Sequence, residues 1–122
     1  MMKYTFLGKN NSLLYIESED ILIYDSQSAL DFMATINYEK DCNRIILDKK
    51  AISEEFFILS SGIAGEVCQK IVNYKFKLAI IGDYSKYTSK SLRDFIYECN
   101  RGNDIFFADN LQQAVDKLDS AR

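Results

Sequence analysis

Three short, mainly apolar runs constrain the fold of this chain more than any other feature. They occupy residues 44–47, 77–82 and 104–107. Runs of this length are typical of strands that are buried on both faces. Longer segments with helical periodicity separate them. Strands joined by helices call for parallel pairing and right-handed connections, so the pattern predicts an α/β sheet.

The N-terminal residues predict an antiparallel edge for this sheet. Residues 3–8 and 12–17 are rich in β-formers, and residues 8–11 between them supply the glycine and asparagines that tolerate positive φ angles. This arrangement predicts a β-hairpin. Residues 21–24 are either a short further strand or an extended lead-in to the first helix. The sheet is therefore expected to be mixed.

About four helices are expected from apolar residues at i, i+3 and i+4 spacing. A short helical turn is also expected at residues 53–55. The expected caps of the four helices are Asp25 or Ser26, Ser60 or Ser61, Thr88 or Ser89, and Asp109 in a capping box with Gln112. The expected inward face of the second helix consists of Ile63, Ala64, Val67, Cys68, Ile71 and Val72.

The size and charge of the chain narrow its partners. Its 122 residues suffice for one domain, expected to span 1–122. The net charge is −3 and the 15 basic residues are scattered, so neither nucleic acid nor an anionic membrane is an expected partner. No run approaches the length of a membrane span, and residues 1–6 lead into no apolar signal region. The three cysteines are odd in number and lack metal-ligand spacing, which indicates reduced thiols and a cytoplasmic location.

The residue types disfavour most enzyme chemistry. Histidine is absent, which removes the usual general base near neutral pH and the commonest zinc ligand. We therefore expect no catalytic residues, no metal and no cofactor. Asp48 and Asp83 follow successive strands and would share one edge of the sheet, where they would either chelate a divalent cation or serve as caps and solvated turns. Cys68 and Cys99 fall on apolar helix faces, where cysteine acts as a small hydrophobic residue.

The start of the second expected helix carries Ser60, Ser61 and Gly62. A helix N-terminus has free N–H groups and a positive dipole end, so it can bind an anion or carry a phosphate on serine. Ser61 and Ser60 are accordingly the phosphorylation candidates. The alternative is that these serines are ordinary helix caps.

A second candidate surface follows the run at residues 77–82. It combines two aromatic and three basic side chains beside the start of the third helix, which predicts binding of an anionic ligand or a partner protein. The alternative is a surface loop without a special role. The candidate residues are Asp83, Tyr84, Lys86, Tyr87, Ser89, Lys90 and Arg93, together with Gly62 from the preceding helix start.

Several motifs in the second half resemble the STAS domain, the fold shared by sulfate-transporter tails and anti-sigma-factor antagonists. They are the Ser-Ser-Gly at 60–62, the strands at 76–82 and 105–107, and the Asn-Leu-x-x-Ala-x-x-x-Leu pattern at 110–118. This resemblance implies a regulatory phosphoserine at Ser61, immediately before the glycine.

Over nearly its full length the chain is more similar to an uncharacterised bacterial family, domain of unknown function 4180. The similar segments are residues 25–31, 64–66 and 87–98. This second resemblance implies no biochemical activity.

The sequence thus predicts a single-domain, STAS-like α/β protein with a mixed sheet and an N-terminal hairpin. The expected function is a non-enzymatic regulatory or binding module that docks a partner protein through the Ser-Ser-Gly helix start and the adjacent loop, switched by phosphate. The alternative is a sensor that binds a small anionic metabolite or nucleotide at the same edge. Dimerisation through the exposed hairpin edge is left open. The docking hypothesis requires Ser61 and Lys86 to lie on one edge of the sheet.

Overall fold

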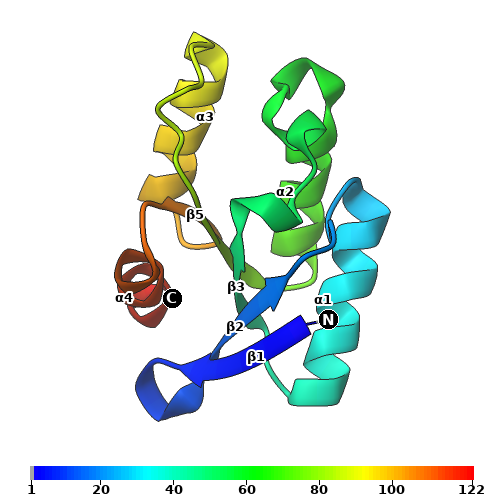
Figure 1. The fold of residues 1–122 in the computed structure, drawn as a ribbon, viewed down its shortest axis with the longest axis vertical. Coiled ribbons are helices and arrows are strands. Elements are labelled where there is room, and N and C mark those ends of the chain that lie inside the picture. Colours follow the sequence, from blue (N-terminus) through cyan, green and yellow to red (C-terminus); the bar gives the residue numbers. More distant parts are fainter. Residues whose placement is uncertain (1) are drawn as a thin grey trace.

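A five-stranded mixed sheet in the order β1-β2-β3-β4-β5 forms the centre of the computed structural model (Figure 1), which describes residues 2–122. Met1 lies outside the described residues, although it belongs to the expected domain (1–122) and to residues 1–6, which were considered as a signal peptide. β1 is antiparallel to β2, and the other neighbours are parallel. The strands are β1 (Met2–Leu7), β2 (Leu13–Ser18), β3 (Arg44–Asp48), β4 (Lys77–Ile81) and β5 (Ile105–Ala108). The predicted hairpin and α/β class are confirmed.

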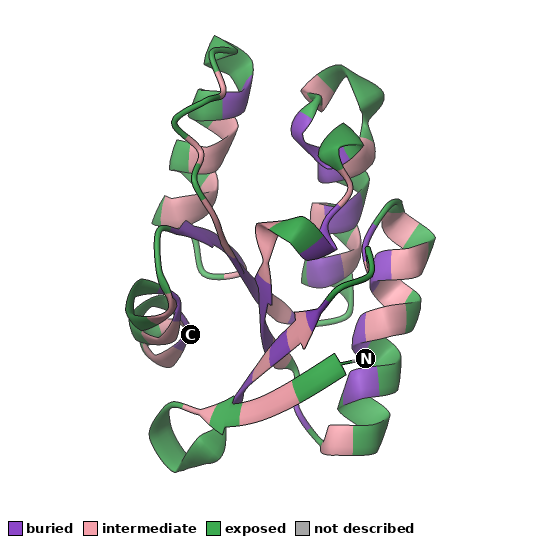
Figure 2. Cartoon of the chain, viewed as in Figure 1, coloured by how far each residue is buried: buried purple, intermediate pink, exposed green. Residues whose placement is uncertain are grey.

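Helices cover both faces of the sheet. Within residues 2–122 the α-helices are α1 (Ser26–Lys40), α2 (Ile63–Asn73), α3 (Lys90–Arg101) and α4 (Leu111–Ser120). Short 3-10 turns are η1 (Lys9–Asn11), η2 (Lys49–Ala51), η3 (Glu54–Phe57) and η4 (Leu59–Ser61). The main core lies between the sheet and α1, α2 and α3, and a smaller core lies under α4. Figure 2 shows the buried residues along β2, β3, β4 and β5 and on the sheet-facing sides of the helices, whereas β1 at the edge has none.

Alternation along each buried strand builds the two cores. On β3, Ile45 and Leu47 point into the main core, while Ile46 between them packs in the core under α4. β5 repeats this pattern with Phe107 in the main core and Phe106 under α4. Successive side chains of a strand point to opposite faces, so a continuous apolar run serves a sheet that is covered on both sides.

Two expected helix caps are wrong by one residue. The N-cap of α2 is Gly62, at φ 82°, and Ser61 instead accepts a hydrogen bond from the Ile63 N–H at 3.2 Å. The cap of α4 is Asn110, whose side chain accepts from the Gln113 N–H at 2.9 Å, and not Asp109 with Gln112. In both places the helix begins one residue later than the polar residues of the sequence predict.

The other caps follow the prediction. Asp25 caps α1 in a reciprocal box with Ser28, and Ser89 caps α3 by accepting from the Leu92 N–H. On α2, Ala64, Val67 and Ile71 are buried, whereas Val72 is exposed, contrary to the expected face. Residues 21–24 make a single bridge, between Ile23 and Ile52, rather than a strand. None of the helices in the described part of the chain is both long and apolar enough to span a membrane.

Candidate functional site

The segments that follow β3 and β4 form one edge of the molecule, which we call the rim (residues 49–62 and 82–93). β3 and β4 are parallel neighbours, so their carboxyl ends lie at the same end of the sheet, toward the top of Figure 1. All ten sequence-predicted site residues belong to these segments: Ser60, Ser61, Gly62, Asp83, Tyr84, Lys86, Tyr87, Ser89, Lys90 and Arg93.

Glu54 of η3 connects the two segments of the rim. Its carboxylate accepts from the Lys49 ammonium at 2.6 Å and from the Tyr87 hydroxyl at 3.1 and 3.0 Å, and Lys86 lies 3.6 Å away. The hydrogen bond from Lys49 is the main reason that the pKa of Glu54 is lowered. Burial, followed by Glu54, raises the pKa of Tyr87 to about 12. The glutamate thereby fastens the turn after β3 to the loop after β4.

An aromatic cluster supports this network from below. Phe57 stacks on Tyr87 with ring centroids 5.3 Å apart, and Tyr84 meets Phe107 edge to face at 5.5 Å. The Lys49 ammonium lies 4.9 Å from the Phe57 centroid and 5.0 Å from that of Tyr87, within cation–π range. Tyr84 donates to the Ile80 carbonyl at 2.7 Å, and burial raises its pKa. The two tyrosines therefore position the loop.

The Ser61 hydroxyl is also tied to η3. It donates to the Glu55 carbonyl at 2.9 Å while accepting from the first N–H of α2. Lys86 pairs with Glu54, the residue next to Glu55. The two residues on which the docking hypothesis depends are thus both connected to η3, and both are exposed. Their grouping rests on parallel strand pairing, which the sequence had indicated.

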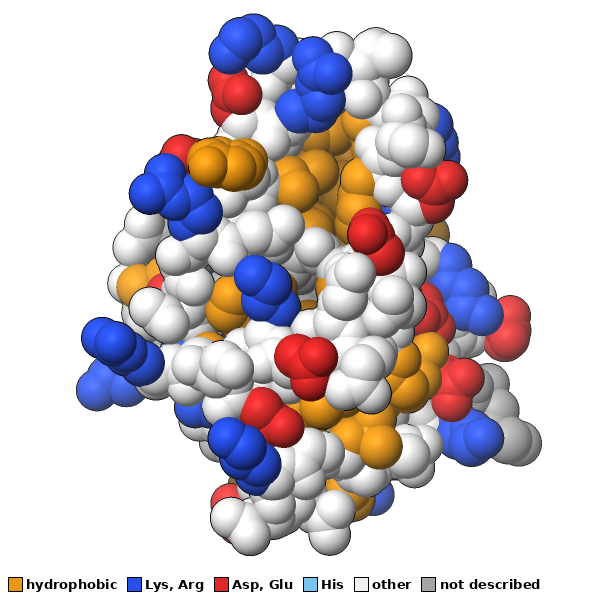
Figure 3. Space-filling view, turned by 90° about the vertical axis from the view of Figure 1, so that its left-hand side faces the viewer, with side chains coloured by type: hydrophobic (Ala, Val, Ile, Leu, Met, Phe, Trp, Pro, Cys, Tyr) orange, Lys and Arg blue, Asp and Glu red, His pale blue; other side chains and the backbone are white. Residues whose placement is uncertain are grey.

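A groove lies between the 3-10 turns and the start of α3, and we call it the rim groove. It measures about 560 Å³ and is lined by Phe57, Ile58, Leu59, Ser60, Ser89 and Ser91. Ile58 is 55% exposed. Figure 3 shows hydrophobic side chains in a hollow near the upper end of the molecule, with basic side chains beside it. Lys90 is paired with Asp94 at 2.7 Å, whereas Arg93 forms no ion pair with another described residue.

A second depression, the lysine hollow, adjoins the Glu54 network and measures about 480 Å³. Lys49, Lys50 and Lys86 line it together with Glu54 and Asp83. These cations give the hollow the means to hold a small anion.

Glycine is required beside the lysine hollow. A Cβ at Gly82 would come within 2.7 Å of the Lys49 Cβ. A larger residue at position 82 would therefore displace the lysine that pairs with Glu54.

The two aspartates that follow the strands have local partners. Asp48 accepts from the Tyr15 hydroxyl at 2.9 and 3.0 Å, which fastens β3 to β2. Burial, followed by this bond, raises the pKa of Tyr15. Asp83 accepts from the backbone N–H and the hydroxyl of Ser85, and these bonds lower its pKa. Across residues 2–122, no set of three or more His, Cys, Asp or Glu side chains is arranged to hold a metal ion.

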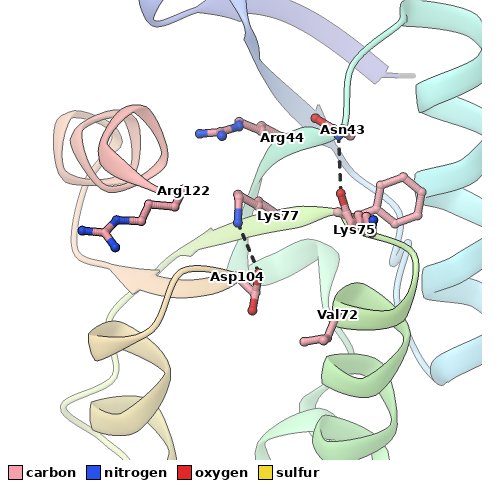
Figure 4. A pocket seen from close by; sticks show the side chains of 8 residues that line it. Asn43, Arg44, Val72, Lys75, Lys77, Asp104 and Arg122 are labelled. Carbon is pink, nitrogen blue, oxygen red and sulfur yellow. Dashed lines mark hydrogen bonds and ion pairs between the residues drawn. The ribbon is translucent and has the colours of Figure 1, made fainter.

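A basic pocket of about 370 Å³ lies at the opposite end of the sheet, where β3 and β4 begin (Figure 4). Lys77 donates to the Asn103 carbonyl at 2.6 Å and pairs with Asp104 at 3.2 Å. Arg44 donates to carbonyls of the C-terminal segment, at Leu118 and Ala121. Lys77 and Arg44 thus bind carbonyl groups of the protein's own backbone, and we assign both residues a structural role.

Sequence reasoning missed Lys49, Glu54 and Ile58 as rim residues. Lys49 and Glu54 meet through the bend between η2 and η3, and their spacing follows no helical or strand period. Ile58 is an apolar residue between two short turns, a context that predicts neither burial nor exposure. The one sequence signal that could have pointed to Ile58 is the presence of an apolar residue shortly before the predicted Ser-Ser-Gly helix start.

Comparison with known proteins adds a family but no activity. A family model described as Domain of unknown function (DUF4180) matches residues 8–118. No curated protein and no solved structure matches the chain.

Proposed function

We propose that this chain, which belongs to the DUF4180 family, is a non-enzymatic regulatory module that docks a partner protein in the rim groove. The exposure of Ile58 beside this groove is the observation that carries the proposal. Burying such a side chain at an interface removes apolar surface from water, worth about 1.5–3 kcal/mol for full burial. The occupant is a segment of the partner with an apolar side chain that fits against Ile58.

Charge complementarity specifies the rest of the occupant. Arg93 stands in the first turn of α3, where its backbone N–H donates to the carbonyl of the groove-lining Ser89, and it has no ion-pair partner among the described residues. Lys86 and Lys90 are on the same segment of the rim and are largely exposed. Acidic residues flanking the apolar side chain of the partner would pair with these cations, which favours orientation and association rate more than affinity.

Phosphorylation of the serines would weaken this docking. Ser60 lines the groove, and Ser61 precedes α2, whose N-terminus favours an added negative charge. A phosphate on Ser61 would give up the hydroxyl donation to the Glu55 carbonyl and repel acidic residues of the partner. We include in this proposal a STAS-like relationship, based on the Ser-Ser-Gly helix start, a bacterial origin, based on the family resemblance, and a cytoplasmic location, based on the three free cysteines.

Photo-crosslinking in the source cell tests the docking site. A crosslinking amino acid at position 58 should capture one defined protein, and the same group at Tyr38 of α1, which is 91% exposed, should not. In pull-downs, Ile58→Glu, Lys86→Glu and Ser61→Asp should each reduce capture of that protein about tenfold or more. Equal capture from positions 58 and 38, or full retention by Ile58→Glu, would contradict docking at the rim groove.

The lysine hollow favours a second function, a sensor for a small anion. Pyrophosphate serves as the probe, because its oxygens can accept hydrogen bonds from the three lysine ammonium groups of the hollow. Binding should raise the thermal midpoint with concentration, by the equivalent of about 2.7 kcal/mol at 100 times Kd. Glu54→Gln should strengthen the effect by releasing Lys49, and Lys86→Glu should weaken it. A midpoint that pyrophosphate leaves unchanged in all three proteins excludes the sensor.

A further inference from the structure

Two of the three cysteines, far apart in the sequence, meet between neighbouring helices. Cys68 of α2 and Cys99 of α3 line the same cavity of about 150 Å³, beside Val72 and Ile105. Both are free thiols of intermediate exposure. We propose that Cys68 and Cys99 are a modification site, a dithiol that hydroperoxides oxidise to a disulfide bridging α2 and α3.

The third cysteine occupies a different environment. Cys42 is buried, and its thiol donates to the Ser12 carbonyl at 3.3 Å and the Arg44 carbonyl at 3.2 Å. Burial raises its pKa, which keeps it protonated and unreactive. Cys42 therefore serves as an internal control for the pair.

The two thiols of the pair are not equivalent. Its neighbour Cys68 lowers the pKa of Cys99, whereas Cys99 and then burial raise the pKa of Cys68. The thiolate is the reactive form of cysteine, so Cys99 is the group that attacks first. Cys68, which lines the same cavity, is placed to complete the bridge.

Two displacements account for all atoms and electrons. The Cys99 thiolate attacks one oxygen of hydrogen peroxide, the O–O bond breaks, and the departing hydroxide takes a proton to leave as water. Cys99 is then a sulfenic acid. The Cys68 thiol, losing its proton, attacks the Cys99 sulfur; the S–O bond breaks, the S–S bond forms, and the second water leaves. The dithiol loses two electrons, and one peroxide is reduced to two waters.

The bridge would restrain the helices that border the rim groove. α2 begins directly after Ser61 and Gly62, and α3 begins directly after Ser89, while Ser60 and Ser89 both line the groove. This modification does not depend on the proposed docking function, because the thiols lie away from the groove-lining residues.

Thiol counting and peptide mapping test the proposal on the full chain. After hydrogen peroxide, the free thiols under denaturing conditions should fall from three per chain to Cys42 alone, with Cys68 and Cys99 recovered in one disulfide-linked peptide pair. Cys42→Ser should form the same pair. Cys68→Ser should accumulate a dimedone-reactive sulfenic acid at Cys99, and Cys99→Ser should form none at Cys68.

If a variant fails to fold, thiol counting and peptide mapping of the wild-type chain are sufficient to test the proposed disulfide. Persistence of three thiols at peroxide concentrations that oxidise free cysteine would overturn the proposal. So would a disulfide that includes Cys42, a bridge between two chains, or conversion of Cys99 to sulfinic acid without a bridge.

Discussion

Gly8→Ala is expected to lower the free energy of unfolding by about 2 to 6 kcal/mol, from backbone strain and overpacking together. Gly8 lies at φ 76° and ψ −172°, a region that is essentially closed to other residues and costs about 1–3 kcal/mol to occupy. A Cβ there would also stand 2.6 Å from Cγ of Leu13 and 2.7 Å from Oδ1 of Asp119. Leu13 is fully buried, so its side chain cannot move aside without disturbing the core under α4.

Urea denaturation measures this loss, and Gly65→Ala provides the matched control. Gly65 lies within α2, and a Cβ there would meet no atom within 4 Å. Alanine is the better helix former by about 0.5–1 kcal/mol, so this variant should unfold at slightly higher urea. If Gly8→Ala unfolds at the urea concentration of the wild-type chain, the hairpin turn is not held in the conformation described.

Elements with strong local signals could be predicted from the sequence. β4 is apolar from Leu78 to Ile81, a pattern typical of a strand that is covered on both faces. α1 is bounded by the capping Asp25 and by Asp41, which is left-handed at its C-terminus. The start of α2 could not be placed correctly because a 3-10 turn ends in Ser61, so the helix begins after Gly62. Helix caps depend on where the preceding chain turns, and that is set by packing rather than by the capping residue.

The strand topology was enough to predict where the rim lies, but not which side chains bind one another there. Parallel pairing of β3 with β4 brings the segments carrying Ser61 and Lys86 to one end of the sheet, and this followed from the strand–helix alternation. The bonds from Glu54 to Lys49 and Tyr87 did not, because they depend on bends and side-chain conformations outside regular structure. The meeting of two cysteines between α2 and α3 was equally hidden, since it depends on how the helices pack.

Phe56→Ala is expected to cost about 3–5 kcal/mol, the usual range for removing a buried phenylalanine from a core. Phe56 is 1% exposed; its ring lies 5.0 Å from that of Phe57 within η3, and it anchors this turn to β5 by packing against Phe107 at 6.3 Å. Denaturant unfolding measures the loss. Because η3 also carries Glu54, the same variant should loosen the contact of that carboxylate with Tyr87.

Ile58→Ala tests whether Ile58 contributes to partner binding rather than to the stability of the fold. Ile58 is mostly in water already, so its truncation should change the free energy of unfolding by only about 0.5 kcal/mol or less. The same truncation should reduce capture of the docked partner, whereas Phe56→Ala should lower the free energy of unfolding far more. Similar unfolding penalties for the two variants would mean that Ile58 belongs to the core, and the rim groove would then lack its apolar contact.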